Sequence, residues 1–96
     1  MSYKIVIVDE AKLDFREAFK YYKDISPKLS RKFNQSFKES LKIVKENPEL
    51  FQIRFDDVRI KILKTFPYLI HFTIYEDLIV IKAIYHSSKN SKLNHF

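Results

Sequence analysis

Basic side chains recur along the C-terminal half of the chain at a spacing that could bring them together. They are Arg54, Arg59, Lys61, His71, Lys82 and His86. Such a cluster could cleave RNA without a metal, because a histidine can transfer a proton while Arg and Lys neutralise the charge on the scissile phosphate. We expect Arg59, Lys61 and His86 to be catalytic, with His86 as the acid or base. We expect Arg54, His71, Lys82 and Lys89 to bind nucleic acid.

A second interpretation assigns these side chains no chemistry. Lys and Arg stems can cover a solvated sheet and protect its edges from pairing, and each histidine can be structural. Composition alone leaves both interpretations open. The net charge of +6 and the pI near 9.5 favour nucleic acid or an acidic protein as partner, although a solvated basic surface has the same composition.

Several kinds of site are excluded by residues that the sequence lacks. Zero cysteines exclude thiolate nucleophiles and cysteine-ligated metals, and the absence of glycine excludes phosphate-cradling loops. On a sheet, His71 and His86 would lie about 13 Å apart along the strands at ~3.3 Å per residue, too far to share a metal. Ser87 and His86 are adjacent and would point to opposite faces of a strand. We therefore expect no metal and no cofactor.

A strand and two helices precede the basic residues and must position them. YKIVIV, residues 3–8, reads as a buried strand, and Asp9 is a suitable N-cap for a helix. Ser26-Pro27 starts a second helix, which stops before Pro48. The apolar stripes of the two helices are Ala11, Phe15, Ala18, Tyr22 and Ile25, then Leu29, Phe33, Phe37, Leu41 and Val44.

From Phe51 to about residue 86 the apolar period changes from about 3.6 to 2, which predicts strands. We place turns at Asp56-Asp57 and Glu76-Asp77. The face toward the helices would then hold Phe51, Ile53, Ile60, Ile62, Ile70, Phe72, Ile74, Ile79 and Ile81. The opposite, open face would carry Ile84 and the cluster of Arg54, Arg59, Lys61, His71, Lys82 and His86.

The predicted fold class is α+β, with the order βααβββ(β) and a two-helix hairpin packed on one face of an antiparallel sheet. Ninety-six residues suit a single domain, 1–96, with a polar tail from about residue 87. The sequence contains no apolar span of twenty residues and no secretion signal, so we expect a soluble, cytoplasmic protein without membrane contact.

Three stretches resemble the RelE/ParE superfamily of toxins from bacterial type II toxin-antitoxin modules. They are YKIVIVDEAKLDFREAFKYY, RKFNQSFKESLKIVKENPELF and VRIKILKTFPYLIHFTIYEDLIVIKAIYHSSKN, and the resemblance spans residues 3 to about 91. It implies a small toxin held inactive in a hetero-oligomer by an antitoxin that covers the sheet. The RelE-like branch cleaves mRNA on the ribosome without metal, and the ParE-like branch poisons DNA gyrase. By position, Arg59 and Lys61 match the basic pair of the RNA-cleaving branch, and His86 to Lys89 match its last basic group.

Three hypotheses about function follow from the resemblance. The first is a ribosome-dependent mRNA endoribonuclease that uses Arg59, Lys61 and His86. The second is a gyrase inhibitor that acts by binding, and the third is a toxin-like domain that has lost activity and binds only its antitoxin. Leu69 stands where the RNA-cleaving branch often has an arginine, which keeps the second and third hypotheses open.

Overall fold

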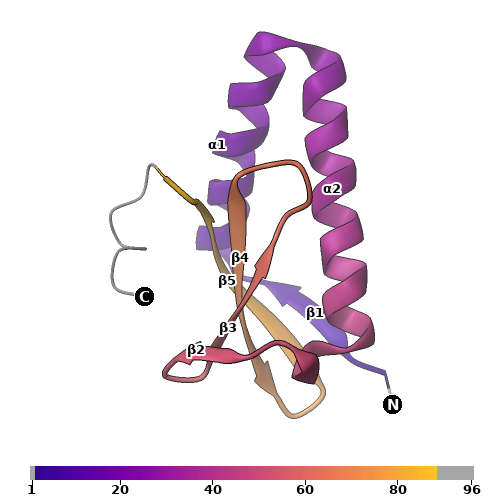
Figure 1. Ribbon diagram of the computed structural model, residues 1–96, viewed down its shortest axis with the longest axis vertical. Helices are drawn as coiled ribbons and strands as arrows, with labels where there is room; N and C mark the ends of the chain where they lie inside the picture. Colours follow the sequence, from indigo (N-terminus) through magenta and orange to yellow (C-terminus); the bar gives the residue numbers. More distant parts are fainter. Residues whose placement is uncertain (1, 89–96) are drawn as a thin grey trace.

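The computed structural model describes residues 2–88, and the order of its elements confirms the predicted one (Figure 1). The elements are β1 (Lys4–Ile7), α1 (Asp9–Ile25), α2 (Pro27–Glu46), the short 3-10 helix η1 (Pro48–Leu50), β2 (Ile53–Phe55), β3 (Val58–Ile62), β4 (Tyr68–Tyr75) and β5 (Leu78–His86). Both helices pack against one side of the sheet, and their far turns extend beyond it as a protruding hairpin (Figure 1).

The helix boundaries follow local chemistry. Asp9 is the first residue of α1 rather than its N-cap, which is Val8, and with Glu10 it places negative charge at the helix N-terminus, where the dipole favours it. Pro27 occupies the first turn of α2, where its missing N–H costs nothing. The α2 helix ends at Glu46 because Asn47 precedes a proline and leaves helical geometry.

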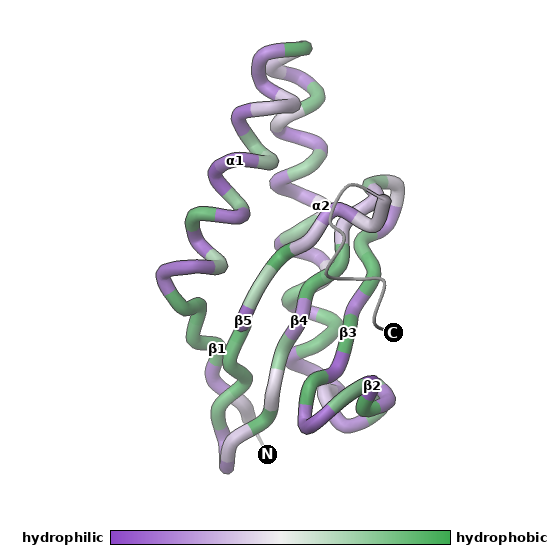
Figure 2. The backbone as a smooth tube through the Cα atoms, turned by 90° about the vertical axis from the view of Figure 1, so that its left-hand side faces the viewer, coloured by the Kyte–Doolittle hydropathy of each residue, from purple (hydrophilic) through white to green (hydrophobic). Residues whose placement is uncertain are grey.

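The five strands form one sheet in the order β1-β5-β4-β3-β2, shown side by side in Figure 2. Strands β2 to β5 pair antiparallel as predicted, but β1 joins the outer edge of β5 in parallel, so the sheet is mixed. The sequence does not reveal this pairing, because it joins residues as distant as Lys4 and Leu78, with no turn between them to set the direction.

The core lies between the helices and the sheet and is rich in aromatic rings. Phe33, Phe72, Ile70, Ile79 and Ile81 are its large, fully buried side chains. Rings from α1, α2 and β4 interlock around Phe33, which lies 5.5 Å from Phe15, 5.2 Å from Tyr22 and 5.4 Å from Tyr68 between centroids. Packing of this density holds both helices against the same face of the sheet.

The two predicted turns are present, although neither contains glycine. Asp56 and Glu76 each take a positive φ, of 50° and 54°, in the left-handed region that short turns between strands require. Beyond the second turn, Ile74 pairs with Ile79 and Phe72 with Ile81, as predicted. No helix among residues 2–88 is long and apolar enough to cross a membrane.

Candidate functional site

The register of β3 against β4 turns the basic side chains of β3 toward the helices. Arg59 lies opposite Phe72 and Lys61 opposite Ile70, and directly opposed residues of an antiparallel pair share one face of the sheet. Phe72 and Ile70 are fully buried in the core beneath the helices. The prediction that Arg59 and Lys61 project from the open face is therefore wrong.

The error arises because the β2–β3 hairpin does not determine which face of β3 reaches the core. Phe55 pairs with Val58 as predicted, but the register then shifts, so that Ile53 pairs with Arg59 instead of Ile60. Both apolar residues of β2 are exposed to solvent. The pairing of β3 with β4 determines which side chains of β3 face the helices, and it places Ile60 and Ile62 on the open face.

Arg59 is engaged in holding the chain together. One guanidinium nitrogen donates hydrogen bonds to the backbone carbonyls of Phe51, at 2.6 Å, and Glu49, at 3.2 Å. The ammonium group of Lys61 lies 6.0 Å from the centroid of the Phe51 ring, and the Tyr3 hydroxyl donates to the Glu49 carboxylate. The contacts of Arg59 and Lys61 tie η1 and the approach to β2 onto β3, which is a structural role for Arg59, and the Tyr3 contact ties η1 to the start of β1.

A β-bulge in β5 changes the side on which its last residues lie. Phe72 pairs with Ile81 and His71 with Ala83, so Lys82 is an extra residue. Beyond it the parity is reversed, and Ile84, predicted on the open face, is instead buried opposite Ile70. The same shift places His86 opposite Tyr68 on the helix side, with ring centroids 5.1 Å apart, so its predicted position on the open face is also wrong.

Asp14 stabilises this bulge from α1. Its carboxylate accepts a hydrogen bond of 3.0 Å from the backbone N–H of Ile84, two residues after Lys82. A bulge interrupts the regular ladder, and a buried N–H needs another acceptor. Sequence reasoning missed Asp14, since an acid beside an apolar helical stripe has the same pattern as a solvated residue.

His86 forms a hydrogen bond with a residue close to it in the chain. Its Nδ1 accepts a hydrogen bond of 3.1 Å from the backbone N–H of Ser88, which leaves the ring proton of the neutral imidazole on Nε2. The neighbouring Tyr68 is no base, because burial raises the pKa of its phenol to about 12.

His71 is on the open face as predicted, but it is nearly inaccessible, with 4% of its surface exposed. The rings of Tyr85 and Phe55 meet it edge to face, at centroid distances of 4.9 and 5.9 Å. Burial lowers the pKa of His71 from 6.5 to about 4. The ring is therefore neutral at pH 7 and carries no charge to attract a phosphate.

Of the remaining predicted nucleic-acid-binding residues, Arg54 on β2 and Lys82 on β5 are exposed, and Lys89 lies outside the described residues. Strands β4 and β3 separate β5 from β2 in the sheet. The structure thus does not bring Arg54 and Lys82 together. Among residues 2–88, no group of three His, Cys, Asp or Glu side chains could hold a metal ion.

The open face is predominantly apolar instead of cationic. Its exposed members include Ile62, Tyr75 and Val6, which expose 60, 65 and 44% of their surfaces. Around them lie Val58, Ile60, Leu69, Thr73, Leu78, Val80, Ala83 and Tyr85. Of these, Val58, Thr73 and Ala83 are buried. Exposed apolar side chains on one face of a sheet are typical of a protein interface.

Comparison with known proteins identifies the family. The sequence model described as "ParE toxin of type II toxin-antitoxin system, parDE" matches residues 5–91. The chain belongs to the ParE toxin family. Among solved structures, it resembles a chain titled "Chromosomal ParDE TA system from P. aeruginosa", with a TM-score of 0.77 and 20% identity. The match covers 88% of this chain and 96% of that one, and it shows a ParE-like fold. No curated protein matches the sequence.

Membership of the ParE family confirms the expected RelE/ParE toxin, and it implies an antitoxin as partner. It does not test the roles assigned to Arg59, Lys61, His86 or the other basic residues, which stay predictions. The choice between the ribosome with its mRNA and DNA gyrase as target is likewise left to experiment.

Proposed function

We propose that this ParE toxin arrests growth in the cytoplasm by binding DNA gyrase, not by cleaving mRNA. The observation that carries the proposal is the engagement of Arg59, whose guanidinium donates hydrogen bonds to the backbone carbonyls of Phe51 and Glu49. Family membership supports it as well, because poisoning of gyrase is what the ParE-like branch of the superfamily implies.

Metal-free RNA cleavage requires a proton-transfer group and cationic groups within reach of the same phosphate. Here the Arg59 guanidinium bonds two backbone carbonyls, while His86 lies near the far end of β5 beside Tyr68. His71 is neutral and buried. Inhibition by binding needs only a surface of suitable shape and charge, and the open face with Arg54 and Lys82 nearby offers one.

The antitoxin would inactivate the toxin by covering the same open face. Its apolar side chains, Ile62 and Tyr75 among them, give a partner segment a large surface to bury. A toxin covered in this way cannot use that face to bind its target. The active state is then the free toxin, and the inactive state is a toxin-antitoxin hetero-oligomer.

The test compares two readouts with purified toxin. We expect inhibition of DNA supercoiling by purified gyrase at micromolar toxin, with no cleavage of mRNA in a reconstituted translation reaction. Stoichiometric antitoxin, identified as the product of the adjacent reading frame, should relieve the inhibition. Unimpaired supercoiling together with cleaved mRNA would refute the proposal and support the endoribonuclease hypothesis.

Two substitutions separate binding from RNA cleavage in cells. Lys61→Ala removes the amine without touching the hydrogen bonds of Arg59, and His86→Gln removes the imidazole. We expect both variants to arrest growth as the parent does, provided that their melting temperatures are within a few degrees of the parent. Loss of growth arrest in a folded Lys61→Ala or His86→Gln variant would support catalysis by these residues.

A further inference from the structure

A strip of basic side chains runs from the first turn of α2 to the loop between β3 and β4. Lys32 lines two hollows in the surface, of about 240 and 270 Å³. Lys28 lines the smaller hollow and Lys64 the larger one, so the three lysines lie in succession and form what we call the basic strip. The loop that carries Lys64 lies beside α2 (Figure 1).

Little acidic charge offsets the basic strip. Residues 25–38 hold four Lys or Arg side chains and no carboxylate, and Glu39 is the one acid that lines either hollow. The strip lysines are exposed, and within residues 2–88 none of them forms an ion pair. Lys28 and Lys32 lie one helical turn apart, where like charges repel. An anion lying along the strip would remove this repulsion.

The loop between β3 and β4 holds Lys64 in place with a strained backbone. Thr65 has a φ of 78°, a left-handed conformation that is rare for a β-branched residue. The Ser36 hydroxyl of α2 donates a hydrogen bond of 2.7 Å to the carbonyl of Lys64. The backbone N–H of Leu63 donates one of 3.0 Å to the carbonyl of Tyr68 across the base of the loop. Strain that the surroundings maintain in this way is typical of functional sites.

We propose that the basic strip binds the phosphate backbone of duplex DNA. Its ammonium groups contact phosphates along one strand. Gln35 and Thr65 line the larger hollow and can donate hydrogen bonds to phosphate oxygens between those contacts. Contacts of this kind carry no base sequence, so the binding is sequence-independent and sensitive to salt.

The residues around the strip favour a duplex over a single strand. Proteins that bind single strands stack the bases on exposed aromatic rings. Phe66 is the one aromatic residue that lines either hollow, and it is buried, with 7% of its surface exposed. A duplex keeps its bases stacked inside and turns its phosphates outward, so it needs only the cations that the strip offers.

Contact with DNA goes beyond the proposed binding of gyrase. The strip lies on α2, which packs on the side of the sheet opposite the open face, so the two surfaces are available together. Gyrase acts on duplex DNA. A toxin that touches both the enzyme and DNA phosphates would be held most tightly while DNA is bound to the enzyme. The contact with DNA is nevertheless a property of the toxin alone.

Fluorescence anisotropy with a labelled DNA duplex of about 20 base pairs tests the proposal on the whole purified chain without gyrase. We expect a Kd of about 1–100 μM near physiological salt, the range of sequence-independent DNA binding. The labelled strand without its complement and an RNA duplex of the same sequence are measured alongside. We expect neither to bind more tightly than the DNA duplex.

A strip variant locates the binding. Lys28→Gln with Lys32→Gln and Lys64→Gln removes the three charges and keeps long, polar side chains at exposed positions. We expect it to bind the duplex at least about tenfold more weakly. The slope of log affinity against log salt should become shallower by about 2–3, because each lost phosphate contact removes about 0.9.

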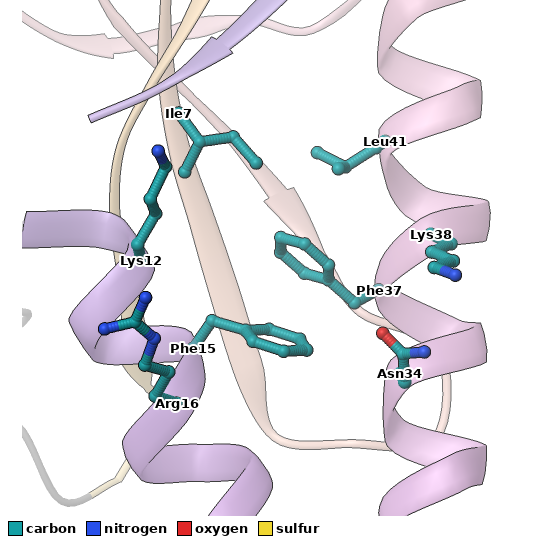
Figure 3. A pocket seen from close by; sticks show the side chains of 8 residues that line it. All are labelled: Ile7, Lys12, Phe15, Arg16, Asn34, Phe37, Lys38 and Leu41. Carbon is teal, nitrogen blue, oxygen red and sulfur yellow. The ribbon is translucent and has the colours of Figure 1, made fainter. Parts of the chain in front are cut away.

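A matched variant makes the same change in net charge outside the strip. It combines Lys4→Gln, Lys12→Gln and Lys45→Gln, which are exposed positions at the end of the molecule away from the hairpin tip. Lys12 of this control lines the groove between the two helices, which none of the strip lysines lines (Figure 3). We expect the control to lower the affinity less than about threefold.

A single substitution changes the strip in the opposite direction. The Glu39 carboxylate lines the larger hollow with Lys32 and Lys64, where it repels a phosphate. Glu39→Gln should therefore tighten binding of the duplex at least about twofold. Glu46→Gln, at the exposed end of the same helix, should change the affinity less than that. Equal tightening in both variants would count against the strip.

Equal weakening in the strip variant and its lysine control would show that net charge alone attracts DNA, and it would overturn the proposal. Absence of duplex binding at about 1 mM protein would overturn it too. Tighter binding of the single strand or of the RNA duplex would assign the strip to another nucleic acid and refute the proposal. The assay contains neither gyrase nor antitoxin, so its failure leaves the proposed function intact.

Discussion

Acid should destabilise this protein through His71. The folded state holds the ring between Phe55 and Tyr85, where burial lowers its pKa from 6.5 to about 4. Between these two values the unfolded chain binds a proton at His71 and the folded chain does not. Stability contributed by the neutral ring is therefore fully present above about pH 6.5 and is lost as the pH falls toward 4.

The size of the effect follows from the shift. A difference of about 2.5 pKa units at about 1.4 kcal/mol per unit corresponds to a loss of roughly 3 kcal/mol at pH 4 and below. Small domains have a total unfolding free energy of about 5–15 kcal/mol, so this loss is easily measured. His71→Phe keeps an aromatic ring in the same place and removes the titration.

The assay is urea unfolding of the parent and of His71→Phe at several pH values from 7.5 to 4. Carboxylates contribute equally in both proteins, so the difference between their unfolding free energies isolates His71. We expect that difference to change by about 3 kcal/mol in favour of His71→Phe as the pH falls. His86→Gln serves as the control histidine variant. Parallel pH profiles for the parent and His71→Phe would refute the reasoning.

Two further predictions concern the backbone. Asp14→Ala leaves the Ile84 N–H without its acceptor and should lower the unfolding free energy by about 1–3 kcal/mol. Asp14→Asn retains an acceptor oxygen and should lower the unfolding free energy less. Equal losses of unfolding free energy in the two variants, measured by urea unfolding, would contradict this role of the carboxylate. Glu76→Gly removes the steric cost of the positive φ at that position. It should raise the melting temperature, with an increase in unfolding free energy of up to about 1 kcal/mol. Asp77→Gly, at a neighbouring position without a positive φ, should lower the melting temperature, and a rise in both variants would count against the explanation.

The elements of the fold could be predicted from the sequence because each follows from a local signal. The steps of three and four between Ala11 and Val44 indicate both helices, and Pro27 and Pro48 mark where they begin and end. The turn at Glu76-Asp77 gives the correct register for Ile74 and Phe72, which lie close to it. The predicted pairs close to this turn therefore held, whereas the predicted pairing of Ile53 with Ile60 in the equally short β2–β3 hairpin did not.

The candidate site could not be predicted in the same way, because the face of each side chain depends on pairings that local signals do not specify. One extra residue, Lys82, moves His86 to the other face of the sheet. In β3 one alternating set, Val58, Ile60 and Ile62, is apolar and the other, Arg59 and Lys61, is cationic, so the pattern favoured the wrong set for the core. Leu63 is buried, with 3% exposed, and shares its parity with Arg59 and Lys61. Leu63 was therefore the one residue in the sequence that indicated that Arg59 and Lys61 lie on the helix side of the sheet.

The parallel pairing of β1 with β5 affects when the toxin can fold during its synthesis. The first strand of the chain has its place only against the last one, through pairs such as Lys4 with Leu78 and Ile7 with Ile81. A nascent chain can form the helical hairpin early, since its contacts are local, but the sheet must wait until β5 has emerged from the ribosome. An incomplete chain therefore lacks the strand that joins β1 to β4, and translation must be nearly finished before the folded toxin exists.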